Sequence, residues 1–396
     1  MPKIKLTKIT KIFIFILLLI FVFWAGFYTG SYLLSPEKFL KFNNQFFSSN
    51  NISILWDVWR ILESKYIEKE KIDIQKAFYG ALNGLVKSVG DDYTEFYSPE
   101  EAKIFNEDVS GSFEGVGMEI TIKKGLVTVV APLEDTPAWR AGIKAGDVIL
   151  KINGEDATNL KLQEAVKKIR GPKGTKVTLT IIRDEFKEPK DFVIVRDVIV
   201  VHSVKTKMLD SNIGYLKIIN FGGNSVSEFT QGVVNLLNQG AEKLIVDLRN
   251  NPGGFLESAV IIAGWFLPKG KIVVKEDFGK DKTQRIHFSQ GPGILSNYPT
   301  VVLINQGSAS ASEILAAALK ENLGFKLIGQ KTFGKGSVQQ IFNLADGSLV
   351  KVTVARWLTP QNNLIEGQGV EPDIKVEEKE NEDKALEKAI EILKKF

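Results

Sequence analysis

The stretch VVLINQGSASASEILAAAL occupies residues 301–319 and changes character twice. Residues 301–304 are apolar, residues 305–313 are mostly small or polar, and residues 314–319 are alanine-rich and form helices well. This order predicts an apolar strand, a close loop and a helix that begins at the loop. Free N–H groups at a helix N-terminus favour negative charge, so a serine in this loop is well placed to become an alkoxide.

The same alternation of apolar strands and helices continues on both sides of this stretch. Further strands are predicted at Ile213–Ile218, Leu244–Leu248 and Lys326–Ile328. Such alternation is typical of an α/β core with a mixed sheet. We therefore predict an α/β core over residues 198–376 and a charged amphipathic helix over residues 377–396.

The part of the chain before this core has two other patterns. Residues 111–197 combine short β-rich runs with one helical stretch, Leu162–Ile169, and predict a small β-barrel-like domain. Residues 35–110 start as a polar linker and become helical, because apolar residues recur at helical spacing from Ile52 to Val89. The expected fold class is mixed α/β, or α+β, with helical regions at both ends.

The N-terminal segment has the pattern of a membrane anchor. Residues 12–34 carry no charge, and four lysines but no acidic residue precede them. About 20 apolar residues cross a bilayer as a helix, and preceding positive charge keeps that end in the cytoplasm. A cleavable signal peptide is the alternative, but its apolar region is about 7–15 residues long and ends at small residues, not at bulky ones such as Trp24 and Phe27. We expect residues 1–34 to form a cytoplasmic tip and a transmembrane signal anchor, with the remainder on the extracytoplasmic side of a bacterial cell membrane.

Composition excludes several kinds of chemistry. The 396 residues include no cysteine and have a formal net charge of +4. These values exclude disulfides, thiolate metal sites and a cysteine nucleophile, and they do not suggest nucleic-acid binding. We expect no metal and no cofactor, because no metal-ligand motif is present. The two histidines, His202 in a predicted valine-rich strand and His287 in a predicted loop, lie outside any motif that would orient a catalytic base.

A serine and a lysine remain as a possible nucleophile and base. Lys335 lies between Gly334 and Gly336, whose backbone freedom can direct the lysine side chain inward, where desolvation would lower its pKa. A serine N-cap and a solvated loop lysine are the structural alternatives, and spacing alone does not choose among the three serines of the loop. The segment 329–335 resembles a P-loop, but Gly336 stands where a magnesium-binding Ser or Thr is needed, so no nucleotide site is expected.

A glycine pair follows another predicted strand. Gly253 and Gly254 end the segment DLRNNPGG, residues 247–254. Glycines at the carboxyl end of a strand can turn backbone N–H groups into the active-site crevice, where they can stabilise an oxyanion.

The domain at residues 111–197 carries a pattern for binding the end of a peptide. Gly115 and Gly117 flank Val116 and precede Met118 at the start of a predicted strand. Such a turn can converge N–H groups on a carboxylate, while the peptide adds as a further strand. Together with the series AGIKAGDVI at 141–149, these residues resemble a PDZ domain. Arg170, after the predicted groove helix, would steer a carboxylate, contact the neighbouring core, or serve as a solvated helix-terminal cation.

The chain after the anchor resembles the carboxy-terminal processing peptidases, or tail-specific proteases. The resemblance rests on a series of motifs in the family's order: DYTEFY at 92–97, the PDZ series, DLRNNPGG at 247–254, GSASASE at 307–313, TFGKGSVQQ at 332–340, RWLTP at 356–360 and GVEPD at 369–373. By motif position the resemblance implies Ser310 as nucleophile, Lys335 as base and Gln339 as the residue that positions the base. It also implies oxyanion donors at Ala311 and at Gly253 or Gly254, and it makes Glu321 a candidate supporting acid.

Together with the anchor expected at residues 12–34, the resemblance implies a membrane-anchored serine endopeptidase that recognises protein C-terminal tails through its PDZ domain. Expected partners are proteins or peptides with apolar C-termini, the membrane through residues 12–34, and a second copy of the chain, for which the helix at 377–396 is a candidate contact. The alternative is a non-catalytic, membrane-tethered PDZ scaffold that binds C-termini.

Overall fold

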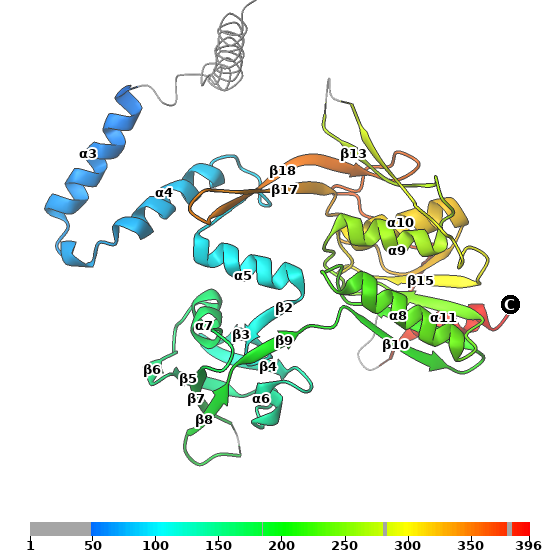
Figure 1. Cartoon of the computed structure of the whole chain (residues 1–396), viewed down its shortest axis with the longest axis horizontal. Coiled ribbons are helices and arrows are strands. Elements are labelled where there is room, and N and C mark those ends of the chain that lie inside the picture. Colours follow the sequence, from blue (N-terminus) through cyan, green and yellow to red (C-terminus); the bar gives the residue numbers. More distant parts are fainter. Residues whose placement is uncertain (1–48, 184, 280–282, 378–381) are drawn as a thin grey trace, which may run out of the picture. The chain divides into compact units, whose positions relative to one another are not determined.

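The computed structural model describes residues 49–183, 185–279, 283–377 and 382–396 (Figure 1). The predicted anchor at residues 12–34 lies outside the described residues. Among the helices that are described, none combines the length and the apolarity that a membrane crossing requires. The chain divides into two compact units, residues 1–80 and 81–396.

In the first unit, the helical prediction for Ile52–Val89 is confirmed with an interruption. Helix α3 spans Ser49–Lys65, a short 3-10 turn follows at Lys69–Lys71, and α4 spans Ile74–Lys87, crossing into the second unit. The apolar residues of α3 lie mostly at the surface of the described part, with the Trp56 side chain 61% exposed.

The core of the second unit is a six-stranded sheet in the order β10-β11-β12-β15-β16-β19. β10 is antiparallel to β11, and the other neighbours are parallel, which confirms the predicted mixed sheet. The strands are β10 (Val204–Leu209), β11 (Ile213–Ile218), β12 (Lys243–Asp247), β15 (Thr300–Ile304), β16 (Lys326–Gly329) and β19 (Ile374–Lys375).

Helices cover both faces of this sheet. Successive residues of a strand point to opposite faces, so neighbouring residues of one strand pack against different helices. Leu244 and Val246 pack with α8 (Ser225–Asn238), α9 (Leu256–Phe266) and α10 (Ala311–Leu323). Ile245, between them, packs with α11 (Lys384–Leu393) in a separate cluster. The sheet is therefore buried on both faces, and its strands end in the loops that carry the candidate site.

The C-terminal helix is shorter than predicted, since α11 covers only Lys384–Leu393 of the expected 377–396. Its apolar side, including Ala385, Ala389 and Leu393, is buried against the core's own sheet. Glu387 and Glu391, on the other side of the helix, are exposed, and the use of this helix in a homodimer stays a prediction.

A second, antiparallel sheet brings distant segments together. Its order is β1-β18-β13-β14, with β17 also paired to β18. The strands are β1 (Glu95–Tyr97), β13 (Ile272–Asp277), β14 (Arg285–Phe288), β17 (Ser337–Asn343) and β18 (Leu349–Leu358). The DYTEFY segment leads into β1, and residues 332–336, which carry Lys335 and are called the lysine loop below, lead into β17. Because β1 and β17 both pair with β18, the sheet brings the two segments to the same part of the molecule.

The PDZ-like domain forms a third sheet, β3-β4-β5-β7-β8, with β6 (Glu155–Asp156) beside β5. Its main elements are β3 (Met118–Lys123), β4 (Leu126–Pro132), α6 (Pro137–Arg140), β5 (Val148–Ile152), α7 (Leu162–Ile169), β7 (Lys176–Ile182) and β8 (Lys190–Val195). β3 lies at the sheet edge, so it pairs only with β4 in that sheet.

A two-stranded ribbon connects this domain with the rest of the chain (Figure 1). β2 (Ser112–Gly115) enters the domain, β9 (Asp197–Val200) leaves it, and the two pair antiparallel. Val201 N donates to Gly111 O at 2.9 Å, which extends the ribbon by one step.

Both histidine placements need correction. His202 lies after β9, not in a strand, and His287 lies in β14, not in a loop. His202 Nδ1 is 3.0 Å from Glu228 Oε1, and His287 Nε2 is 2.7 Å from Glu276 Oε1. Among the residues that the structure describes, each histidine is paired with a glutamate and neither is hydrogen-bonded to a serine.

Candidate active site

Burial distinguishes the three serines in the loop before α10. The Ser308 hydroxyl donates to Leu248 O at 2.8 Å, and the Ser312 hydroxyl donates to Asn251 O at 2.9 Å. Both of these serines are fully buried, whereas Ser310 between them is partly exposed. Two of the hydroxyls therefore fix the loop, and Ser310 presents the accessible one.

The backbone of Ser310 is in an unusual conformation. Its φ of 55° and ψ of −116° lie outside the regions that a residue with a side chain usually adopts. Such strain costs about 1–3 kcal/mol and persists only when the surroundings hold it. Here Ser310 N donates to Glu313 Oε2 at 2.8 Å, one turn into α10.

Glu313 joins the serine loop to the lysine loop. Besides Ser310 N, its fully buried carboxylate accepts hydrogen bonds from Lys335 N at 2.9 Å, Gly334 N at 2.7 Å and the Thr332 hydroxyl at 2.5 Å. Burial raises the pKa of Glu313, and these hydrogen bonds oppose that rise. One carboxylate thus fixes the spacing between the two loops.

Lys335 is partly buried, and its amine lies against an aromatic ring. The nitrogen is 4.9 Å from the centre of the Tyr93 ring. Desolvation lowers the pKa of Lys335, the nearby Lys351 charge lowers it further, and Glu95, Glu366 and Glu313 oppose both effects. Within the described residues, the Lys335 amine and the Ser310 hydroxyl share no hydrogen bond.

The glycine turn after β12 touches the serine loop. A Cβ atom on Gly253 would lie 2.8 Å from Ser310 Cβ and 3.0 Å from Ala311 N. Gly253 N already donates to Asn251 Oδ1 at 2.8 Å. Gly254 N and Ala311 N donate no hydrogen bond within the described chain, so Gly254 is the better of the two glycines to pair with Ala311 around an oxyanion.

A network of charges fixes the strand that leads to this turn. Asp247, fully buried at the end of β12, binds Arg249, and Arg249 binds both oxygens of Asp383 at 2.6 and 3.0 Å. Asp383 also caps α11 by accepting from Leu386 N at 3.0 Å. The C-terminal helix is therefore tied directly to the base of the glycine turn.

Two predicted supporting residues have other partners in this structure. The Gln339 amide donates to Ser337 Oγ at 2.7 Å on β17, and no contact joins it to Lys335 among the described residues. Glu321, near the end of α10, accepts from Gln361 N at 2.8 Å and Asn363 Nδ2 at 3.0 Å. Glu321 thus fixes a loop on the far end of the helix from Ser310.

The PDZ-like domain has the geometry for holding a carboxylate. Ala138 N donates to Val116 O at 2.7 Å, and Leu133 N donates to Gly117 O at 3.0 Å. In a trans peptide the N–H points opposite to the carbonyl, so the N–H groups of Gly117 and Met118 point away from those donors. Gly115 ends β2 immediately before this turn. Beside the turn, β3 offers a free edge along α7.

Arg170 does not lie free in the predicted groove. Its guanidinium lies 4.2 Å above the centre of the Phe113 ring, and one nitrogen is 3.4 Å from Glu107 Oε2 on α5 (Pro99–Ser110). This contact is with α5, in the predicted helical region at residues 35–110, and not with the predicted core at residues 198–376.

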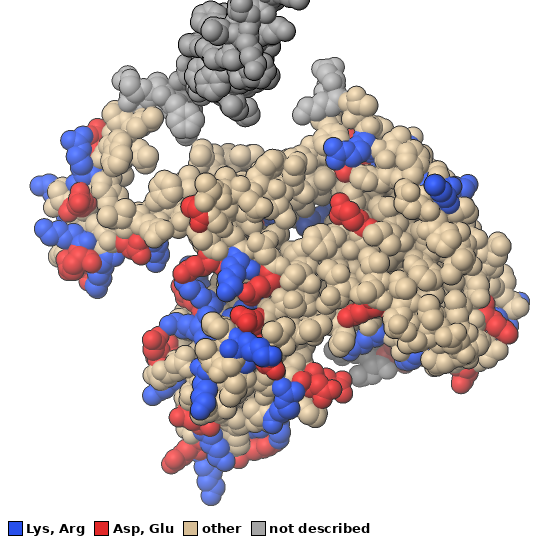
Figure 2. Space-filling view, viewed as in Figure 1, with Lys and Arg blue, Asp and Glu red and all other residues tan. Residues whose placement is uncertain are grey.

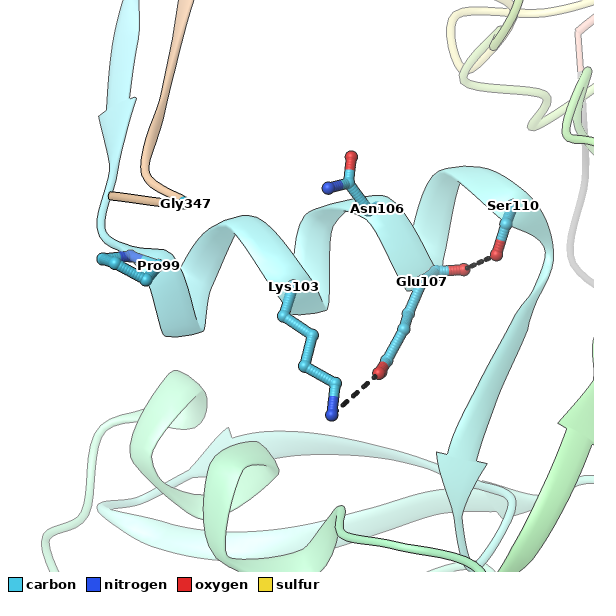
Figure 3. A pocket seen from close by; sticks show the side chains of 6 residues that line it. All are labelled: Pro99, Lys103, Asn106, Glu107, Ser110 and Gly347. Atoms are coloured by element: carbon cyan, nitrogen blue, oxygen red, sulfur yellow. Dashed lines mark hydrogen bonds and ion pairs between the residues drawn. The ribbon is translucent and has the colours of Figure 1, made fainter. Parts of the chain in front are cut away.

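An open hollow of about 490 Å³ lies along the same helix (Figure 3). Its lining includes Lys103 and Glu107, which face each other at 3.9 Å, and Gly347 of the β17–β18 turn. None of its lining residues belongs to the serine, lysine or glycine loops, so it is distinct from the candidate active site.

No group of three or more His, Cys, Asp or Glu side chains within the described residues could hold a metal ion. On the face in Figure 2, basic and acidic side chains are interspersed over the PDZ-like domain.

Comparison with known proteins gives the family. The model of peptidase family S41 matches residues 212–376, and a PDZ-domain model matches residues 128–183. A probable CtpA-like serine protease of Staphylococcus aureus (strain COL) is 39% identical over 348 residues, which cover 88% of this chain and 68% of that protein. The chain belongs to peptidase family S41.

Other S41 relatives extend this result. The carboxy-terminal processing protease CtpA of Bacillus subtilis (strain 168) is 41% identical over 308 residues, covering 78% of this chain and 66% of that protein. The solved structure of photosystem II D1 C-terminal processing protease is 30% identical, with a TM-score of 0.51, and the match covers 81% of this chain and 86% of that one. The matches cover 65% of a Staphylococcus epidermidis relative, 66% of the Bacillus subtilis relative and 68% of the Staphylococcus aureus relative. The chain therefore spans about two thirds of the length of these curated relatives.

The sequence analysis missed two residues of this S41 site. Glu313 had a detectable signal, because a Ser followed three residues later by Glu is the pattern of a capping box. Tyr93 belongs to the DYTEFY motif, but no sequence signal placed it beside Lys335, because the two residues lie far apart in the chain and come together through the pairing of β1 with β18.

Proposed function

We propose that this S41 chain is a serine endopeptidase of the carboxy-terminal processing type, with Ser310 as nucleophile and Lys335 as general base. The observation that carries the proposal is the single accessible serine at the start of α10, held by Glu313 at a fixed spacing from a desolvated lysine. The proposal is consistent with the family and with the protease activities for which the relatives are named.

The proposed reaction passes through an acyl-enzyme. Neutral Lys335 takes the hydroxyl proton as Ser310 Oγ attacks the substrate carbonyl, and the N–H groups of Ala311 and Gly254 hold the oxyanion. The leaving amine takes the proton from Lys335 as the peptide bond breaks. A water molecule then attacks the ester while Lys335 takes its proton, and Lys335 returns that proton to Ser310 Oγ as the ester bond breaks and the second product leaves.

The PDZ-like domain is proposed to bind the substrate's C-terminal tail. The Gly117 and Met118 N–H groups would donate hydrogen bonds to the terminal carboxylate, and the tail would pair with the edge of β3. Buried and partly buried apolar residues beside that edge, including Val116, Ile120 and Ile169, favour an apolar last side chain.

Membrane anchoring completes the proposal. Residues 12–34 are uncharged and follow four lysines, which supports a single-pass anchor with the peptidase on the extracytoplasmic side.

The decisive experiment is cleavage of an unfolded protein with an apolar C-terminus by the full chain and by single variants. Ser310→Ala and Lys335→Ala should each lower kcat by at least about 10³-fold while the fold is retained. Ser227→Ala, on the exposed side of α8, and Lys331→Ala, at an exposed loop position, are matched controls that should keep wild-type rates. Full activity in either site variant would disprove its assignment.

The scaffold alternative gives a different result in the same assay. A PDZ scaffold would bind the tail peptide with wild-type and Ser310→Ala chains alike, but the wild type would cleave nothing. Cleavage that depends on Ser310 excludes that alternative.

A further inference from the structure

A loop near the C-terminal end of the core packs directly against the lysine loop. Gly367 N donates to Gly334 O at 2.9 Å. A Cβ atom on Gly336 would lie only 2.0 Å from Glu366 N, so residue 336 must be glycine for the two backbones to approach this closely. These contacts fix Glu366 beside Lys335 through the main chain.

The Glu366 carboxylate has one oxygen without a partner. Oε2 is buried and makes no hydrogen bond in the described chain. A buried, unpaired carboxylate oxygen is unfavourable, so it should gain a donor in some state of the enzyme. The Glu366 charge acts on two neighbouring groups. The pKa of Tyr93 is raised chiefly by burial and further by Glu366. The pKa of Lys335 is lowered chiefly by desolvation, and the charge of Glu366 opposes that change.

The other charged groups that face Lys335 are already engaged. Lys351 on β18 pairs with Glu95 on β1 and donates to the Tyr97 hydroxyl at 3.1 Å. Glu313 on α10 accepts the four hydrogen bonds described above. Among these groups, Glu366 has the free acceptor.

We propose that Glu366 is a positioning residue for the base, and that its free carboxylate oxygen holds the ammonium that Lys335 forms on taking the Ser310 proton. The inference rests on the proposed Ser310–Lys335 mechanism. The proton passes from Ser310 Oγ to Lys335 Nζ and then to the leaving amine, and no proton passes to Glu366. The carboxylate lowers the energy of the charged intermediate and keeps the amine away from the Tyr93 ring during turnover.

The test compares Glu366→Gln with the wild-type full chain in peptide hydrolysis across pH. Glutamine keeps the shape but removes the negative charge. The maximal kcat should fall by about tenfold or more, because the lysine ammonium is no longer compensated, while KM stays within about twofold. At the same time the ascending limb of the pH profile should move to lower pH, because Lys335 loses its proton more easily without the adjacent charge.

Two further variants separate positioning from general structural support. Glu366→Asp should recover part of the rate, and Glu371→Gln, at an exposed ion pair with Lys331, should change neither the rate nor the profile. A wild-type rate and profile in Glu366→Gln would overturn the proposal. So would a lower rate with an unmoved pH limb and no recovery in Glu366→Asp.

A titration that needs no turnover distinguishes this inference from the proposed function. In chains with isotope-labelled lysine, the Lys335 signal is assigned by its loss in Lys335→Arg and followed by NMR across pH. Glu366→Gln should lower the Lys335 pKa, and an unchanged pKa contradicts the inference even if cleavage depends on Ser310. Absence of cleavage by the wild type, together with a shifted Lys335 pKa, would contradict the proposed function instead.

Discussion

At the scale of single residues, the candidate site depends on which polar groups already have hydrogen-bond partners. The hydroxyls of Ser308 and Ser312 donate hydrogen bonds to main-chain carbonyls, and the Ser310 hydroxyl remains accessible. Lys335 is set beside an aromatic ring and within the field of Lys351, and desolvation is the largest influence on its pKa. The chemistry follows from which groups already have partners.

The pH dependence of hydrolysis follows from the lowered pKa of Lys335. A lysine base works only when neutral, so kcat/KM should rise with pH through one ionisation whose midpoint lies below 10.5, the ordinary lysine value. A rate profile from mildly acid to alkaline pH measures this midpoint, which belongs to the coupled pair if Ser310 titrates with it. A flat profile, or a midpoint at the ordinary lysine value, would argue against a desolvated lysine base.

Glu313→Gln should separate the serine loop from the lysine loop. A glutamine side chain offers one acceptor oxygen where the carboxylate offers two, and its NH₂ group would face backbone donors. We expect a loss of unfolding free energy of about 1–3 kcal/mol in urea denaturation, together with a lower kcat. Glu257→Gln, at an exposed position on α9, serves as the control and should leave both unchanged.

At the scale of elements, four strands of the core sheet and the helix after Ser310 were predictable, whereas the remaining core elements and the pairings between distant segments were not. Apolar runs at 213–218 and 301–304 gave β11 and β15 within one residue at each end, because buried parallel strands have continuous apolar sequence. The pairing of β1 with β18 has no local signal, so the approach of Tyr93 to Lys335 could not be foreseen. The choice of Ser310 from the sequence depended on the family resemblance, since burial of its neighbours is a tertiary effect.

Asp383→Asn should loosen α11 without removing its cap. Asparagine caps helices as well as aspartate does, so the variant isolates the ion pair with Arg249. Because the Asp383 side chain is 44% exposed and screened by solvent, we expect a loss of about 0.5–1 kcal/mol at neutral pH in urea denaturation. Asp383→Ala, which also removes the cap, should lose more.

The pH dependence of that loss gives a further check. Burial alone would raise the pKa of Asp383, but hydrogen bonds from Arg249 and Leu386 N outweigh it and the pKa is lowered. The stabilisation is therefore present above the unfolded-state pKa of about 3.9 and disappears as pH falls through the folded-state value. The difference between wild type and Asp383→Asn should shrink in acid, and a difference that stayed constant there would exclude the ion pair as its source.

At the scale of the whole molecule, the sequence predicted the order of parts, and the structure describes them from residue 49 onward. The prediction of an anchor at residues 12–34 remains a prediction. It rests on length, lack of charge and the preceding lysines, all of which are properties of the sequence alone.

Membrane fractionation checks the anchor directly. The full chain should stay with membranes after an alkaline carbonate wash, whereas a chain lacking residues 1–48, or one with Leu18→Arg and Leu19→Arg, should be released. In intact cells with a permeable outer layer, added protease should digest the peptidase part without lysis. Recovery of the full chain in the soluble fraction, or protection until lysis, would contradict the proposed location.

The β2–β9 ribbon has a consequence for engineering this chain. Gly111 and Val201 are joined by a backbone hydrogen bond, although the whole PDZ-like domain lies between them in sequence. Because Gly111 and Val201 already lie side by side, joining them directly would add little loop-closure cost. The domain between them can therefore be removed or exchanged as a cassette. Cassettes with different grooves on one hydrolytic core would then show how far the choice of substrate resides in the exchanged piece.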